Sequence, residues 1–255
     1  NEIGKEVRSL AVELGKTPEQ VSALYAGLAQ GGAPKENLRE IAKLAGQVGV
    51  AFDIDPGIAG ARFIKLSNAM ELTVEQTQGV TDAINHLSDN SAAKASEMLD
   101  FFAAGGAGAT RAMQITGEQG AALASVYLSM GKSGSESATI IERMTKTLRN
   151  QDKQAGKIFA QSGGGLAGVL AVLEKGGQLT GAQKFEFFKE FGEYGIEVEQ
   201  LANNSDLLQK QLALVADKAG VAGSVQREFA NRSKTTAFRL AQAQANAQAL
   251  AIEVG

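Results

Sequence analysis

The sequence predicts an all-α protein, a multi-helix bundle of short glycine-terminated helices followed by a longer C-terminal helix. Three observations support this class: apolar residues recur at helical spacing, short polar tetrads precede the apolar stretches, and glycines follow them. Nowhere in the 255 residues do five or more positions alternate strictly between apolar and polar with β-branched enrichment. We therefore predict no strand.

Apolar side chains repeat at intervals of three and four residues along most of the chain. This spacing places them on one face of a helix, and each set forms a stripe that needs a packing partner. Leu123 and Ile141 are accordingly predicted to lie in the core. The clearest stripes are Val21, Leu24, Tyr25 and Leu28; Leu123, Val126, Tyr127 and Met130; Ile141, Met144 and Leu148; and Leu208, Leu212 and Val215.

Helix starts are indicated by a recurring tetrad that begins with Thr and ends with Gln. In a capping box the Thr hydroxyl accepts a hydrogen bond from the backbone N–H three residues on, and the Gln side chain accepts one from the backbone N–H of the Thr. We therefore expect four helices to begin at Thr17–Gln20, Thr73–Gln76, Thr116–Gln119 and Thr180–Gln183.

Glycine predicts the helix ends, because it adopts the left-handed conformation that closes a helix. The expected stops are Gly31-Gly32, Gly131, Gly176-Gly177, Gly192, Gly195 and Gly220, and they leave helices of roughly 12 to 20 residues. From Ser224 to Val254 there is no Gly or Pro. One helix of about 30 residues, about 45 Å long, is expected there.

The composition excludes several classes of function. Lys and Arg total 25 against 28 Asp and Glu, so the chain carries no general attraction for a phosphate backbone, and no specific nucleic-acid binding is expected. The absence of cysteine and the single histidine, His86, exclude disulfides, thiol nucleophiles and Cys/His zinc sites. His86 lies near a predicted helix end, where a surface or capping role is favoured.

Two fragments imitate a phosphate-binding loop, Gly15-Lys16-Thr17 and Gly131-Lys132-Ser133. A phosphate loop needs a further glycine five residues before the Gly of its Gly-Lys pair, and those positions hold Leu10 and Val126. The glycine-rich runs at 105–108 and 163–165 lack the strand that a dinucleotide site requires, so close packing or a break in the chain is the favoured interpretation.

The acidic residues form no convincing catalytic pair. Glu197 and Glu199 alternate across a helix, and Glu186 with Glu190 beside Lys189 is typical of a solvated helix face. We therefore predict that the protein is not an enzyme and that it has no catalytic, cofactor-binding or metal-binding residues and no cofactor.

Two apolar runs of the sequence are too short to span a membrane. Gly163 to Leu173 is about 11 residues and Phe101 to Ala109 is shorter, whereas a spanning helix needs roughly 20. Both are expected to be buried turns of helix. The chain opens at Asn1 with neither an initiator Met nor an export leader, so it is expected to be processed or to be a window of a longer protein.

The aromatic residues Phe185, Phe187, Phe188 and Phe191 lie close together in the sequence. They form either core or a partner-facing surface, and core is favoured; the same holds for Phe101-Phe102.

Residues 66–148 resemble the core region of phage tail tape-measure proteins. The resemblance lies in an ordered set of features: the helix opening at Thr73–Gln76, a long Ala-rich helix, a second opening at Thr116–Gln119, and the turn at Gly134-Ser135-Glu136 before Ile140 and Leu148. The segments FFKEFGEYGIEVEQLANNSDLLQKQL (187–212) and SKTTAFRLAQAQANAQALAIEVG (233–255) extend it. Departures occur at Ser137-Ala138-Thr139, where the family usually has Ala-Gly-Thr, and at the glycine run 163–165.

The resemblance implies a structural protein of a phage or prophage-derived tail. Such a protein lies in the tail lumen, sets the length of the tail, and leaves before the DNA at genome ejection. Its implied partners are other copies of itself and tail-tube, baseplate or tail-assembly chaperone proteins, with the host membrane at ejection. The implied location is the virion tail lumen, preceded by the host cytoplasm during assembly.

The resemblance also divides the chain into an N-terminal helical segment (1–65), a tape-measure core region (66–160) and a C-terminal helical region (161–255). Because caps and glycines interrupt the helices, this window is expected to be an assembly or docking domain, with the extended ruler outside it. Segment 187–212 and the final helix are the expected partner surfaces. Two alternatives remain: a membrane-active segment that helps DNA cross the cell envelope, and a cell-wall-degrading module.

Overall fold

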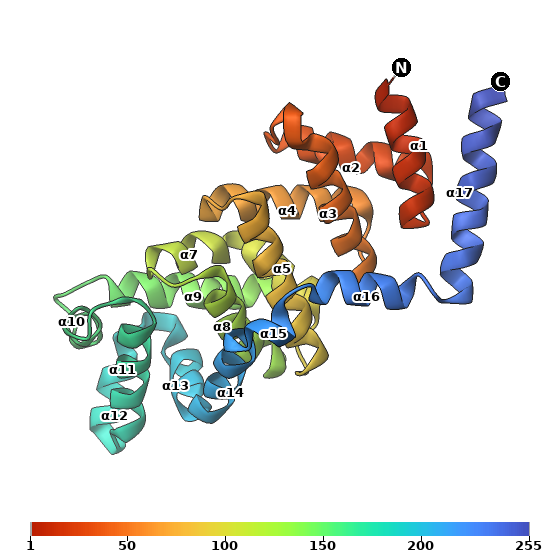
Figure 1. Cartoon of the computed structure of the whole chain (residues 1–255). Helices are drawn as coiled ribbons and strands as arrows, with labels where there is room; N and C mark the ends of the chain where they lie inside the picture. Colours follow the sequence, from red (N-terminus) through yellow and green to blue (C-terminus); the bar gives the residue numbers. More distant parts are fainter. Residues whose placement is uncertain (1, 255) are drawn as a thin grey trace. The chain divides into compact units, whose positions relative to one another are not determined.

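A computed structural model describes residues 2–254, with the side chains of residues 3–251. Within these ranges every regular element is helical, which confirms the all-α prediction. The chain divides into two compact units, one formed by residues 1–85 and 222–255 and the other by residues 86–221. The helices are shown in Figure 1.

The first unit combines the beginning and the end of the chain. Its helices α2 and α4 pack closely through glycine, since a Cβ on Gly60 would meet Leu24 Cδ1 at 2.7 Å and one on Gly27 would meet the Gly57 carbonyl oxygen at 3.0 Å. Helix α16 packs on α3, and α17 lies beside α1 (Figure 1). The elements are α1 (Glu2–Leu14), α2 (Pro18–Gln30), η1 (Lys35–Asn37), α3 (Leu38–Ala51), α4 (Pro56–Met70), α5 (Val74–Asp89, shared with the second unit), α16 (Ser224–Arg232) and α17 (Thr236–Val254).

A buried carboxylate joins the two sequence-distant parts of this unit. Asp82 on α5 accepts hydrogen bonds from the backbone N–H groups of Gly223 (3.0 Å) and Val225 (2.9 Å), at the start of α16. Asn85 donates to Ser224 Oγ at 2.9 Å. The start of α16 therefore obtains its capping groups from a helix about 140 residues earlier in the chain.

The second unit is built around α8, on which ten of thirteen residues are buried. Helices α6, α7, α9 and α14 all pack against α8. Leu123 and Ile141 are fully buried, as predicted. The elements are α6 (Ala95–Phe101), the π-turn η2 (Phe102–Gly106), α7 (Ala107–Ala112), α8 (Gly117–Ser129), α9 (Gly134–Leu148), α10 (Gln154–Gln161), α11 (Gly165–Gln178), α12 (Gly181–Lys189), η3 (Gly192–Tyr194), α13 (Gly195–Asn203), α14 (Ser205–Ala216) and α15 (Lys218–Val221).

Helices begin at all four predicted tetrads, and three of the four form the predicted capping box. Thr17, Thr73 and Thr116 each accept from the Gln three residues on, and each donates its own N–H to that Gln side chain. The capping box predicted for the fourth tetrad is wrong: Thr180 precedes α12, but its side chain makes no capping hydrogen bond. A further box, missed because it ends in Glu instead of Gln, starts α9 at Ser133.

The glycine stops are confirmed only in part. Gly32 (φ +86°) and Gly131 (φ +88°) follow α2 and α8 in the left-handed region, as predicted. Gly176 instead lies inside α11, and a Cβ there would meet Phe188 Cζ at 2.5 Å. Its function is close packing, as is that of Gly195, where a Cβ would lie 2.4 Å from the Phe188 carbonyl oxygen. Gly220 lies within α15.

The single helix predicted from Ser224 to Val254 is wrong. The chain breaks between Arg232 and Thr236 to give α16 and α17, of 9 and 19 residues. The Thr235 hydroxyl donates to the Arg232 carbonyl and accepts from the N–H of Phe238, so it ends one helix and starts the next. Hydroxyl side chains compete in this way with continuing helix, and neither Gly nor Pro is needed.

The expected helix length of 12 to 20 residues is also too long for part of the chain. Helices α6, α7, α10, α12, α13, α15 and α16 contain between four and nine residues. The run FFAAGGAGA is interrupted by η2, where Gly105 has φ +120°. Phe101 and Phe102 are buried, as favoured, but Ala104 and Gly105 are exposed, so the run is not a wholly buried helical turn.

The run from Gly163 to Leu173 begins as a loop, because Gly163, Gly164 and Gly165 all have positive φ. Only its later part belongs to α11. Within the described part of the chain, no helix is long and apolar enough to cross a membrane.

Candidate functional site

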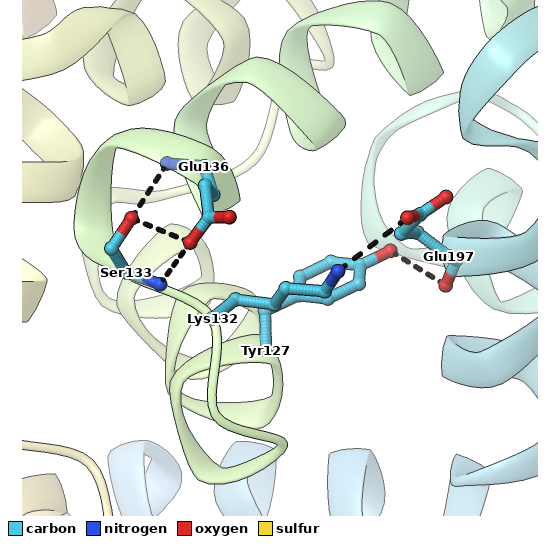
Figure 2. Close-up of polar contacts among 5 residues, drawn as sticks. All are labelled: Tyr127, Lys132, Ser133, Glu136 and Glu197. Carbon is cyan, nitrogen blue, oxygen red and sulfur yellow. Dashed lines mark hydrogen bonds and ion pairs between the residues drawn. The ribbon is translucent and has the colours of Figure 1, made fainter.

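Segment 187–212, expected from the sequence to meet partners, lies in the second unit and is held there by two glutamates. We call it the Phe–Gly segment. Glu197 and Glu190 each connect it to the region that contains α8, α9 and α10. Figure 2 shows the contacts of Glu197, toward which Tyr127 and Lys132 both point.

The Glu197 contacts use both its backbone and its side chain. Tyr127, fully buried on α8, donates its hydroxyl to the Glu197 carbonyl oxygen at 3.3 Å. Lys132 Nζ lies 3.5 Å from Glu197 Oε1, with both side chains largely shielded from solvent. Burial, and then the charge of Glu197, raise the pKa of Tyr127 well above its ordinary value. Tyr127 therefore remains a neutral hydrogen-bond donor.

The turn that carries Lys132 is itself fixed by a capping box (Figure 2). Ser133 N–H donates to Glu136 Oε2 at 2.8 Å, and Glu136 N–H donates to Ser133 Oγ at 3.2 Å. The hydrogen bond from the Ser133 backbone, followed by that from its hydroxyl, lowers the pKa of Glu136. Glu97 on α6 accepts from the N–H of Gly134 at 2.9 Å, so the α9 start is also tied to a neighbouring helix.

Glu190 caps a helix that lacks a cap of its own. Its carboxylate accepts from the backbone N–H groups of Gln154 and Ala155, both at 2.9 Å, at the start of α10. Its carbonyl oxygen accepts from the side chains of Thr147 and Lys153. A carboxylate at a helix N-terminus satisfies free N–H groups and interacts favourably with the helix dipole. The prediction that Glu190 belongs to a solvated face is therefore wrong.

The aromatic residues of this region divide between core and surface. Phe187, Phe188 and Phe191 are buried and meet one another at ring distances of 5.3 to 6.3 Å. Phe185 is 65% exposed, with the Lys189 ammonium 5.8 Å from its ring centre, and Ile196 is 69% exposed. The interior interpretation holds for three of the four phenylalanines.

A second exposed apolar surface lies on α17. Leu240 and Leu250 are each 61% exposed, and Ala243 and Ala247 between them are exposed as well. Steps of three, four and three residues place all four on one face of the helix, in the spacing of a coiled-coil seam. We call this the α17 face. Ala245 points the other way and is buried.

The other residues considered from the sequence have structural contacts. His86 lies half-buried in the last turn of α5, near the helix end as predicted. Thr17 and Ser133, the last residues of the two phosphate-loop imitations, cap α2 and α9. Glu199 pairs with Lys184 at 3.4 Å and not with Glu197, so these two carboxylates have separate partners, as their spacing predicted.

Among the described side chains, no group of three or more His, Asp or Glu residues is placed to hold a metal ion. The Glu197 and Glu190 contacts bring a neutral phenol, an ammonium and backbone amides to carboxylates and carbonyls. This arrangement anchors one segment to another. Capping chemistry could have indicated Glu136 from the sequence, whereas Glu190 and Glu197 meet partners 35 to 70 residues away.

Comparison with known proteins gives a consistent result. The chain is 30% identical over 104 residues to a probable tape measure protein of Halomonas phage phiHAP-1, a match that covers 41% of this chain and 12% of the relative. The chain thus matches only a small part of that relative's length. No solved structure matches. The family model for phage-related minor tail proteins matches residues 5–238. Because this match covers most of the chain, the protein belongs to the phage-related minor tail protein family, and the resemblance to tape-measure proteins is confirmed.

Proposed function

We propose that this chain is a folded assembly or docking domain of a tail tape-measure protein, and that the extended ruler lies outside residues 1–255. In this role it has no enzymatic activity. It joins copies of itself, or other tail proteins such as tube, baseplate or chaperone proteins, in the host cytoplasm and then in the tail lumen, and it leaves at genome ejection.

The observation that carries this proposal is the short length of the helices. The longest described helix, α17, has 19 residues and spans about 28 Å. A ruler made from 255 residues of continuous helix would reach about 380 Å. Capping boxes, tight glycine contacts and the Glu190 contact instead turn the chain back on itself within each compact unit. Most residues of such a chain lie in folded cores, so the chain is not extended.

The exposed apolar residues support a docking role. Exposed Phe185 lies just before the Phe–Gly segment and exposed Ile196 lies within it, and the segment is anchored by Glu190 and Glu197. The α17 face presents leucine and alanine at the spacing that suits close helix pairing, so a second copy of this helix is the proposed partner there. The division into segments 1–65, 66–160 and 161–255 also remains a proposal.

An in-frame deletion tests the role. Removing α11 and α12 from the phage protein should leave tails that fail to initiate or that lose their uniform length, as measured by electron microscopy. Tails that assemble efficiently and are shorter by the helical length of the deleted residues, about 1.5 Å per residue, would identify this region as ruler.

Two further assays separate the alternatives. Leakage from dye-loaded liposomes would indicate a membrane-active segment, and release of soluble fragments from purified cell wall would indicate a degrading module. For a docking domain we expect neither liposome leakage nor release of cell-wall fragments.

A further inference from the structure

The break between α16 and α17 departs little from an α-helix. Ser233 has φ −64° and ψ −16°, in the right-handed helical region, and its N–H still donates to the Phe229 carbonyl, four residues back, at 2.9 Å. The N–H groups of Lys234 and Thr235 donate three residues back instead, at 3.2 and 3.0 Å, as in a 3₁₀ turn. All three residues of the break are described, and none has a positive φ. A shift of a few hydrogen bonds therefore separates this turn from continuous helix.

The sequence permits that shift. From Ser224 to Val254 there is neither Gly nor Pro, the two residues that most disfavour a helix interior. Alanine, the strongest helix former, recurs throughout α17. With residues 233–235 in helical conformation, α16 and α17 would form one helix of about 30 residues, about 45 Å long.

Two contacts hold the bend that Figure 1 shows between α16 and α17. The Thr235 hydroxyl donates to the Arg232 carbonyl and accepts from the N–H of Phe238. The ring of Phe238 meets that of Phe229 edge to face, with the ring centres 6.0 Å apart. In a straight helix, residues nine positions apart are separated by about 13 Å along the axis and lie on opposite sides, so this ring contact exists only in the bend.

The contact of α17 with α1 is small. Among the described side chains of α17, Ala245 alone is buried, and an alanine side chain removes little apolar area from water. Gln242 Nε2 donates to the Val12 carbonyl at 3.0 Å. Phe238 lies close to Gly15, where a Cβ would meet the ring at 3.1 Å. Few groups therefore hold α17 on α1, and a straight state can compete with the bent one.

We propose that the C-terminal arm, formed by α16, residues 233–235 and α17, has two states: bent against α1 as in this structure, and straight as one continuous helix. Straightening leaves the hydrogen bonds of Asp82 at the start of α16 in place and lifts α17 from α1. This switch is a property of the chain alone and does not depend on the docking role. Under that role it regulates docking, because it uncovers the side of α17 that packs on α1 in addition to the α17 face.

Spin labels on the full chain distinguish the two states. The chain contains no cysteine, so Lys5→Cys with Gln248→Cys places one label on α1 and one on α17, both at exposed positions. Pulsed electron paramagnetic resonance should give a dominant short distance, because packed helices lie about 8–10 Å apart, and a minor long one. In a second pair, Ala230→Cys with Gln248→Cys, the minor population should give a narrow peak at about 27 Å, as expected at 1.5 Å per residue.

Two neighbouring substitutions should move the equilibrium in opposite directions. Thr235→Ala removes the hydroxyl that ends one helix and starts the next, so the long-distance population should rise about fivefold, the factor for a typical N-cap. Thr236→Pro places proline at the first position of α17, a position that Pro18 and Pro56 occupy in α2 and α4. In a straight arm the same proline would lie in a helix interior. This variant should fold in the bent state and lose the long distance.

Thr139→Ala is the matched control, because its hydroxyl also bonds a carbonyl, on α9 in the second unit, and it should leave all distances unchanged. The proposal would be overturned by a short distance alone in both the parent and Thr235→Ala, or by a long distance that persists in Thr236→Pro. A broad distribution for the second label pair would also overturn it, because α17 would then leave α1 by unfolding. None of these outcomes touches the docking proposal, which is judged by the tail lengths of the deletion variant.

Discussion

Helices α8 and α17 have similar compositions and opposite environments. Both are rich in alanine and lack charge over most of their length. On α8 ten of thirteen residues are buried, whereas on α17 Ala245 is the only position buried between residues 236 and 251. Alanine content therefore does not determine whether a helix is interior or exposed.

The difference arises from the residues between the alanines. α8 places Leu123, Val126 and Tyr127 among small residues, so neighbouring helices can approach it from several sides. α17 places glutamine at 244 and 248, where both side chains are exposed and favour contact with water, and at 242, whose side chain donates to the Val12 carbonyl of α1 at 3.0 Å. One face of α17 packs on α1, and the α17 face stays open. The proposed docking role would use both kinds of helix, one for the folded core and one for contact with a partner.

The largest difference in stability between α8 and α17 is expected when a leucine on each helix is changed to alanine. Leu123→Ala on α8 should lower the free energy of unfolding by about 2–4 kcal/mol, because it leaves a cavity in a fully buried site. The matched control, Leu240→Ala on α17, should change it by less than about 0.5 kcal/mol. Urea denaturation followed by circular dichroism measures both. Equal losses would mean that α17 is buried in solution.

Two Gly→Ala substitutions in the second unit should change the free energy of unfolding in opposite directions. At Gly134 a Cβ would lie 2.3 Å from the Glu97 carbonyl oxygen, a backbone atom, so Gly134→Ala should cost about 1–3 kcal/mol. At Gly108 on α7 nothing lies within 4 Å, so Gly108→Ala should stabilise by about 0.5–1 kcal/mol through helix propensity. Thermal melts of the two variants should shift in opposite directions. Parallel shifts would contradict the close approach of α6 and α9.

The anchoring of the Phe–Gly segment predicts a smaller effect. Tyr127→Phe removes the hydrogen bond to the Glu197 carbonyl and should destabilise by about 1 kcal/mol, as for a typical buried hydrogen bond. Tyr194→Phe, at a half-buried site, serves as the control. Hydrogen exchange should show faster exchange in residues 195–203 of the Tyr127 variant alone; unchanged protection there would argue against the anchor.

The same tyrosine makes stability depend on alkaline pH. Its pKa is raised in the folded protein, so above the unfolded value of about 10 the unfolded state ionises and the folded state does not. The contribution of Tyr127 to stability is therefore complete below about pH 10 and is lost as the pH rises further. Tyr127→Phe should reduce this decrease, measured as the urea midpoint from pH 9 to 11. An identical pH profile in the variant would show that other groups are responsible.

The smallest effect is expected at His86. His86→Ala at this half-buried position should change stability by less than about 0.5 kcal/mol and leave tail assembly intact. Loss of assembly in a correctly folded His86 variant would contradict the non-catalytic proposal.

The sequence alone determined those features whose partners lie within a few residues. The boxes at Thr17, Thr73 and Thr116 form because both members belong to the same helical turn. The burial of Leu123 and Ile141 followed from stripes at helical spacing, and the order of such features identified the family.

Only the tertiary structure decided the features that depend on distant residues. Glu190 and Glu197 became anchors, and Phe185 was exposed while Phe187 was buried, because helices far along the chain pack on one face of this region and not on the other. The break between α16 and α17 shows the same limit, since Ser and Thr can either continue a helix or end it. At the α16 start, two N–H groups are satisfied by Asp82, a carboxylate that no local pattern relates to them.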